Sequence, residues 1–255
     1  MKHKLLQLLG DNARADRAAP SIRADASGDV GHVYVYDVID SYWGASAKAL
    51  VEALAGMGGK DVHLHINSPG GDVFEARTMV SAVRGYAGTV TAYIDGLAAS
   101  AATYLALAGA QTHIAEGGMF MVHNSWTLAW GNKSELRSTA DLLDKIDGTI
   151  VADYARKTGA KSDQIVSWMD AETWFTADEA KAAGFVDSVI TGGAAPADAT
   201  QASAARWNLS AYAHAPQLAP PAQPAGPSAA ELTALADRQA RLNRSRLAAL
   251  LQPRT

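Results

Sequence analysis

The stretch Ile66-Asn-Ser-Pro-Gly-Gly-Asp72 decides the fold of this chain. Before it, residues 61–66 alternate apolar side chains with histidines, which predicts a strand. Pro69 fixes a turn, and a helical pattern follows over residues 72–84. Strand, turn and helix in this order form a βα unit. Glycines let backbone N–H groups approach a ligand closely, and the following helix adds the positive end of its dipole.

Such a turn has more than one interpretation. An isolated Pro-Gly-Gly is most often an ordinary connection between a strand and a helix. A phosphate-binding turn is the alternative. The sequence argues against a P-loop that hydrolyses nucleotides, because that loop has the pattern G-x-x-x-x-G-K-[ST] and Gly59-Lys60 is followed by Asp61.

The alternation of strands and helices continues on both sides of this turn. It predicts an α/β domain with a largely parallel sheet. Strands are expected at residues 33–37, 61–66, 89–94, 119–122 and 185–190. Helices are expected after Ser46 and over residues 72–84, 98–108, 133–157 and 176–184.

The composition excludes several classes of protein. The chain has 255 residues, 48% of them hydrophobic, which is enough for a sizeable core, and its net charge of −4 argues against a nucleic-acid binder. The absence of cysteine excludes disulfides, cysteine-ligated zinc and a cysteine nucleophile. No run of about 18 apolar residues exists, so no membrane-spanning helix is expected. The apolar part of the N-terminus ends at Gly10 and is too short for a secretory signal.

Composition also divides the chain into four parts. Residues 1–30 are polar and Ala-rich, and we expect them to form an N-terminal arm. Residues 31–190 carry the strand signals and form the main domain. Residues 191–228 are rich in Ala and Pro and predict a linker, since such a segment buries too little apolar area to offset its ordering entropy. Residues 229–255 return to a helical pattern and predict a C-terminal tail.

Two further stretches place polar groups next to strand ends. In Asp95-Gly-Leu-Ala-Ala-Ser-Ala-Ala102, Ser100 falls in the first turn of a helix among small residues that leave room for a substrate carbonyl. In Met119-Phe-Met-Val-His-Asn124, His123 follows a short apolar strand, where catalytic groups of α/β folds often lie. Taken singly, Ser100 is more often a helix cap and His123 more often a structural histidine.

Acids and further histidines give weaker signals. In Met169-Asp-Ala-Glu-Thr-Trp-Phe175, either Asp170 or Glu172 could orient a histidine, although both could be solvated loop acids. His63 and His65 stand two residues apart, a spacing that could seat a metal. No third ligand is evident beside them, which favours an exposed strand face instead.

These stretches, in this order, resemble the proteolytic subunit of the Clp protease and its relatives over about residues 31–190. The resemblance implies an α/β fold of the ClpP/crotonase-like type, a spiral of ββα units with a long protruding helix, followed here by a disordered linker and a C-terminal helix. It is carried by Ile66–Gly71, Ala98–Ser100, Met121–His123, the helical pattern over residues 133–157, and Phe175–Asp187.

The resemblance implies a serine endopeptidase without a metal or other cofactor. Ser100 would be the nucleophile and His123 the general base, with the N–H groups of Gly71 and Ala101 forming the oxyanion hole. The usual third residue is an Asp two positions before the aromatic that Phe175 matches, where this chain has Thr173. We therefore expect the adjacent Glu172 to orient His123, with Asp170 as the alternative.

Residues 33–38 and 172–176 look like phage and prophage members of this family, which are similar to head-maturation proteases. This implies protein substrates from the capsid or its scaffold, and no nucleic-acid or membrane partner. It also implies action without an ATPase, since no ATPase motif is present. The helix over residues 133–157 implies a homo-oligomeric ring. The implied location is the cytoplasm of a bacterial host or the phage procapsid.

Three other functions compete with this one. A crotonase-like enzyme acting on acyl-CoA would need no Ser–His pair, so Ser100 and His123 argue against it. A protease resembling signal peptide peptidase A would use a Ser–Lys pair, but Lys133 is the only lysine near His123 in the sequence. A capsid scaffold without catalytic activity would suit the linker and the terminal helix.

Overall fold

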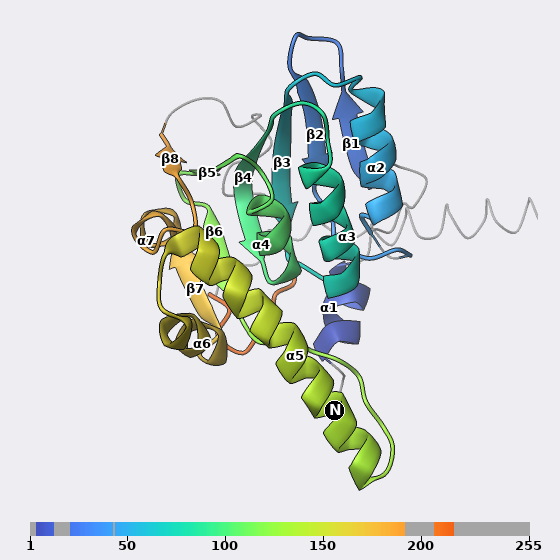
Figure 1. The fold of residues 1–255 in the computed structure, drawn as a ribbon, viewed down its shortest axis with the longest axis vertical. Coiled ribbons are helices and arrows are strands. Elements are labelled where there is room, and N and C mark those ends of the chain that lie inside the picture. The colour runs from blue at the N-terminus through green and yellow to red at the C-terminus, as the bar shows by residue number, and fades with distance from the viewer. Residues whose placement is uncertain (1–3, 13–20, 43, 192–206, 217–255) are drawn as a thin grey trace, which may run out of the picture. The chain divides into compact units, whose positions relative to one another are not determined.

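A largely parallel sheet forms the frame of the structure, a computed structural model that describes residues 4–12, 21–42, 44–191 and 207–216 (Figure 1). The strands run in the order β1-β2-β3-β4-β5-β8, and β6 pairs with β4 and β7. The pairs β1–β2 and β6–β7 are antiparallel and the others are parallel. The α/β class expected from the sequence is confirmed. The strands are β1 (Ile22–Asp25), β2 (Gly31–Val35), β3 (Val62–Ser68), β4 (Val90–Ala99), β5 (Gln111–Ala115), β6 (Met119–Val122), β7 (Thr173–Thr176) and β8 (Ser188–Ile190).

Helices cover one face of this sheet, and the core lies beneath them. Val33, Leu64 and Ile94 alternate with polar neighbours along β2, β3 and β4, and each is fully buried in one cluster with residues of α2 and α3. Ser46 caps α2 as the sequence predicts, accepting a hydrogen bond from the N–H of Ala49. The helices are α1 (Lys4–Asn12), α2 (Ala47–Gly56), α3 (Val73–Arg84), α4 (Ala101–Ala106), α5 (Lys133–Thr158), α6 (Ser162–Asp170) and α7 (Ala177–Ala182).

The long strand β4 differs from its prediction and shapes the site. We expected the strand to end at residue 94 and a helix to begin at Ala98, but β4 continues to Ala99 and α4 begins at Ala101. The first half of β4 pairs with β5, and Leu97, Ala98 and Ala99 pair with β6. The new strand partner supplies ladder hydrogen bonds, so the small apolar residues stay extended despite their helical composition.

Helix α5 projects from the domain (Figure 1). A capping box of Asn132 and Glu135 begins it, and Gly159 ends it in the left-handed conformation. Its buried residues, Ile150 and Tyr154, both lie in its C-terminal half. Leu136 and Leu142, in the N-terminal half, are exposed. The apolar residues of α5 are therefore divided between the core and an exposed surface.

The two terminal regions contribute more structure than their composition suggests. Helix α1 and strand β1 fall inside the predicted N-terminal arm, and Leu8 is buried. Within the predicted linker, residues 207–216 pack against the domain, where Trp207 and Tyr212 share a small apolar cluster with Leu8. The rest of the linker beyond residue 191 and the predicted tail over 229–255 lie outside the described residues. Across the described ranges, no helix combines the length and apolar character needed to cross a membrane.

The core and the exposed half of α5 should respond differently to truncation. Leu64→Ala removes a fully buried side chain and should lower the free energy of unfolding by about 2–5 kcal/mol. Leu136→Ala, at an exposed position, should change it by less than about 0.5 kcal/mol in the isolated chain. Denaturant unfolding of both variants measures these changes, and equal destabilisation would contradict the assigned core.

Candidate active site

Ser100 lies in the turn between β4 and α4. Its φ of 53° and ψ of −124° are strained for a residue with a side chain. The backbone N–H of Ser100 donates to the carbonyl of Met121 at 2.9 Å, which fixes the turn to the neighbouring strand β6. A strained serine between a strand and a helix presents its hydroxyl at the edge of the sheet, as the nucleophile turn of α/β-hydrolases does.

His123 follows β6 and faces this serine. Ala99 pairs with Met121 in the parallel ladder. His123 comes two residues after Met121 and therefore lies beside Ser100. The His123 Nε2 atom lies 2.7 Å from the Ser100 Oγ, a hydrogen bond of the length that a nucleophile and its base require. The structure thus brings together two residues that the sequence placed at separate strand ends.

Glu172 comes to the same place through β7. The antiparallel register pairs Val122 with Thr173, so Glu172 stands opposite His123. Its charge acts on His123 and raises the pKa of the imidazole against the lowering effect of burial. Among the described residues, Ser100 and Glu172 are the two non-glycine residues with positive φ. Strain of this kind persists where the surroundings impose it, and it clusters at functional sites.

The alternative acid lies elsewhere. The Asp170 carboxylate accepts a hydrogen bond from the Asn124 side chain at 2.8 Å, in an exposed position. Thr173, which stands where an Asp was expected, donates its hydroxyl to the carbonyl of Trp168. Of the two acids, Glu172 is therefore the one that lies opposite His123 and acts on the pKa of its ring.

Two glycines bring the β3–α3 turn close to Ser100. A Cβ on Gly70 would lie 2.6 Å from the Ala99 carbonyl and 2.8 Å from the Ser100 Cβ, and a Cβ on Gly71 would lie 2.1 Å from the Ile39 carbonyl. Both glycines also have positive φ. No side chain fits at either position without moving backbone, so the turn requires glycine.

The candidate oxyanion donors, the N–H groups of Gly71 and Ala101, lie where the β3–α3 turn approaches the start of α4. The Ile39 N–H donates to the Gly70 carbonyl, and the Ile39 carbonyl accepts from the Asp72 N–H. Both of these hydrogen bonds are made by the neighbours of Gly71 and neither by Gly71 itself. The Gly71 N–H therefore points away from Ile39. Ala101 is the first residue of α4, where backbone N–H groups have no acceptor within the helix.

The imidazole of His123 packs against two aromatic rings. Its centroid lies 4.5 Å from that of Trp126 and 5.4 Å from that of Tyr212. Burial lowers the pKa of His123 to about 4, with Glu172 acting in the opposite direction and Lys4 adding to the decrease. The ring is consequently neutral at neutral pH and able to accept a proton.

A cavity of about 160 Å³ opens beside Ser100 and His123. Most of its wall is apolar, which suits the side chains of an extended peptide. The sequence indicated no such pocket, because its lining comes from six separate regions of the chain. The residues that line it include Leu8, Phe74, Tyr104, Trp126, Leu142, Leu143, Ile146 and Tyr212.

Sequence reasoning missed the part of the site formed by residues 207–216. Trp207 and Tyr212 are the aromatic residues of an otherwise Ala-rich and Pro-rich region, and that contrast was the available signal. Tyr212 lines the cavity, and burial raises the pKa of its hydroxyl, which therefore stays protonated.

Known proteins share this chain's central region. Residues 31–193 match the model of the Clp protease family. The ATP-dependent Clp protease proteolytic subunit of Bacteroides fragilis (strain ATCC 25285) is 31% identical over 134 residues, 52% of this chain and 65% of that protein. The Bacteroides thetaiotaomicron subunit is 31% identical over 137 residues, 52% of this chain and 61% of that protein. Subunit 1 of Corynebacterium jeikeium is 31% identical over 134 residues, 52% of this chain and 71% of that protein.

The chain spans less than two thirds of the length of the two Bacteroides relatives. The family match nevertheless covers more than half of the chain and includes every residue of the site except those contributed by α1 and residues 207–216. This chain belongs to the Clp protease family.

Proposed function

We propose that this chain is a serine endopeptidase with Ser100 as nucleophile and His123 as general base. The observation that carries the proposal is the 2.7 Å contact between the Ser100 Oγ and the His123 Nε2, made by a serine in a strained turn. Membership of the Clp protease family supports the same reaction. Glu172, opposite His123 in the sheet register, is the proposed third residue.

The reaction follows from this arrangement. His123 accepts the hydroxyl proton as the Ser100 Oγ attacks the scissile carbonyl carbon. The N–H groups of Gly71 and Ala101 stabilise the negative charge that develops on the carbonyl oxygen, and loss of one such donor costs about 100–1000-fold in rate. The imidazolium then protonates the leaving amine as the C–N bond breaks. The acyl group remains bound to the Ser100 Oγ as an acyl-enzyme. Water, deprotonated by His123, releases the acyl group and restores the serine.

We further propose that the chain is a head-maturation protease of a phage or prophage, which cleaves capsid or scaffold proteins in the host cytoplasm or the procapsid. The resemblance of residues 33–38 and 172–176 to phage members supports this assignment. The proposed assembly is a homo-oligomeric ring without an ATPase partner. The exposed Leu136 and Leu142 of α5, and the exposed Trp130 before it, support burial against further copies.

A fluorophosphonate probe tests the nucleophile. Intact-mass spectrometry should show one adduct on the wild-type chain and none on Ser100→Ala, because the probe reacts with an activated serine. Ser125→Ala is the matched control, since Ser125 lines the same cavity, and it should label like the wild type. A wild-type chain that is folded and assembled but unlabelled would instead support a scaffold without catalytic activity.

The buried imidazole predicts an unusual pH profile. Only neutral His123 accepts the serine proton, so the labelling rate should fall as pH decreases through the folded pKa of about 4, and not near the ordinary histidine value of about 6.5. Glu172→Gln removes a charge that raises this pKa, so its inflection should move lower. Labelling rates should be measured from roughly pH 3.5 to 8, a range that includes both the folded pKa of about 4 and the ordinary histidine value. Each sample is checked for folding. An inflection above 6 would contradict it.

A further inference from the structure

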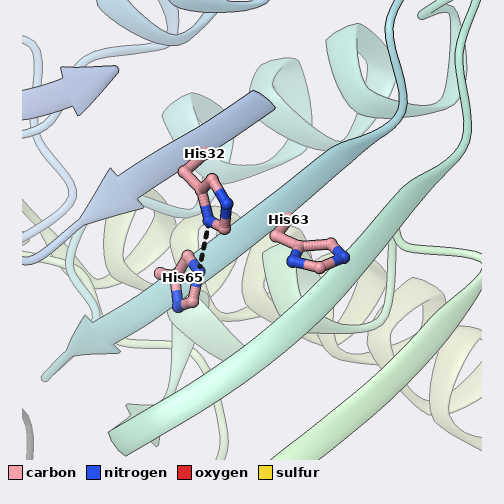
Figure 2. A group of neighbouring side chains, drawn as sticks. All are labelled: His32, His63 and His65. Carbon is pink, nitrogen blue, oxygen red and sulfur yellow. Dashed lines mark hydrogen bonds between the residues drawn. The ribbon is translucent and has the colours of Figure 1, made fainter. Parts of the chain in front are cut away.

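Three histidines meet on the face of the sheet opposite α2 and α3. His32 belongs to β2, and His63 and His65 belong to β3 (Figure 2). The parallel register pairs His32 with His63, and places His65 one side-chain repeat further along the same face. One ring nitrogen from each histidine lies within 4.8 Å of those of the other two. The register between strands supplies the third histidine that the sequence alone did not indicate beside His63 and His65.

The closest pair already has the spacing of metal ligands. The His32 Nδ1 atom lies 3.2 Å from the His65 Nε2 atom, and Figure 2 shows the two rings facing each other. Zinc binds imidazole nitrogen at about 2.0–2.1 Å, so two ligands of a tetrahedral site lie about 3.3 Å apart. His63 is half-buried, and one of its ring nitrogens lies within 4.8 Å of the other two ligand atoms, so it would complete the set by moving toward them.

A buried carboxylate orients the central histidine. The His65 Nδ1 atom lies 2.8 Å from the Asp95 carboxylate, and both side chains are nearly inaccessible to solvent. The same carboxylate oxygen accepts the hydroxyl of Tyr36. Asp95 therefore holds the proton of His65 on Nδ1 and directs the lone pair of Nε2 toward His32. Metal-binding histidines commonly have a carboxylate in this position, which fixes the tautomer and the ring orientation.

We propose that His32, His63 and His65 bind one Zn²⁺ ion, with Asp95 as the positioning residue for His65. The ion would replace the proton shared between His32 and His65, and a water molecule would occupy the fourth position. Because the ligands come from two neighbouring strands, the ion would join β2 to β3. Aromatic rings flank the cluster, with Tyr34 and Tyr93 stacked on His65 at centroid distances of 4.6 and 5.4 Å.

Metal titration of the full chain without a histidine tag tests this site. After removal of metal with a chelator, calorimetry should show one Zn²⁺ bound per chain, and Co²⁺ should give the visible absorption of a tetrahedral site. His32→Ala and His63→Ala should each abolish both signals. Both residues are half-buried, so the variants should remain folded, which circular dichroism checks. Asp95→Asn should weaken binding by about 10–100-fold.

Two other histidines provide the controls. His113 lies on the same sheet face but bonds Ser188, and His123 bonds Ser100. His113→Ala and His123→Ala should both retain the site. Absence of Zn²⁺ binding by the wild-type chain would show that the histidines are only part of a stacked aromatic layer. Binding that survives in His32→Ala and His63→Ala would equally overturn the proposal.

A second and independent inference comes from residues 207–216, which contact both sides of the candidate active site. Trp207 Nε1 donates to the Asn67 side chain at 3.1 Å, and the Tyr212 hydroxyl donates to the carbonyl of Pro69. Asn67 lies near the end of β3 and Pro69 in the turn that follows, so both contacts fall on the stretch that leads to the proposed oxyanion donor Gly71. Tyr212 also lines the same cavity as Ser100, and the Ser100 side chain acts on the pKa of its hydroxyl, so the phenol lies beside the nucleophile.

The same segment binds the proposed acid. The N–H groups of Ala213 and His214 donate to the two Glu172 carboxylate oxygens at 2.9 and 2.6 Å. His214 Nδ1 adds a contact of 2.9 Å to the Ala171 carbonyl. The segment therefore contacts the acid, lines the cavity beside the nucleophile, and packs its Tyr212 edge-on against the ring of the base, His123.

We infer that residues 207–216 form an inhibitory segment that must leave before a protein substrate reaches Ser100. This inference rests on the proposed function. The ring of Tyr212 occupies space next to the Ser100 Oγ that the scissile peptide needs, and the segment's backbone donors use the carboxylate that would otherwise face His123.

Labelling kinetics of the full chain separate this inference from the proposed function. Tyr212→Ala should raise the rate of fluorophosphonate labelling at Ser100 by at least about 10-fold, which corresponds to about 1.4 kcal/mol of lost protection. Ser210→Ala, an exposed change in the same segment, should leave the rate unchanged. If Ser100 labels in both chains but Tyr212→Ala is no faster than wild type, the segment does not inhibit. If Ser100 labels in neither chain, the proposed function itself fails.

Discussion

The site depends on the pairing of β6 with the last residues of β4. This short parallel ladder joins Ala98 and Ala99 to Phe120 and Met121, and the Ser100 N–H extends it by donating to Met121. It accounts for the continuation of β4 past its predicted end and for the positive φ of Ser100. It also carries His123 to the serine. A strained backbone persists only when its surroundings over-determine it, and the ladder supplies that constraint.

Close packing around the ladder explains the small residues near Ser100. Ala98, Ala99, Ala101 and Ala102 are each fully buried, and Gly70 approaches the backbone on the other side of the serine. Larger side chains at these places would push the β3–α3 turn away from α4 and separate the two proposed oxyanion donors. The run of small apolar residues thus serves backbone approach more than helix formation, although its composition favours a helix.

The sequence pattern predicted those elements that depend on interactions between residues close together in the chain. The βα unit at Ile66–Asp72, the long helix from Lys133 and the capping box at Thr176 all depend on neighbours within a few residues. The placement of His32, Trp207 and Tyr212 depends instead on strand register and on contacts across more than a hundred residues, such as Trp207 with Asn67. No periodicity within a short window encodes such contacts, so the histidine cluster and the segment over the site required the structure.

The position of Glu172 connects the segment to the strength of the base. Burial disfavours the charged imidazole of His123, and the carboxylate opposite it is the group that partly offsets this effect. While the N–H groups of Ala213 and His214 bond that carboxylate, part of its hydrogen-bonding capacity is directed away from His123. Departure of the segment would expose the ring to water and free the carboxylate, and both changes raise the pKa of His123 toward neutrality. A base with a pKa closer to the working pH transfers protons more effectively, so uncovering Ser100 and strengthening its base would be one event.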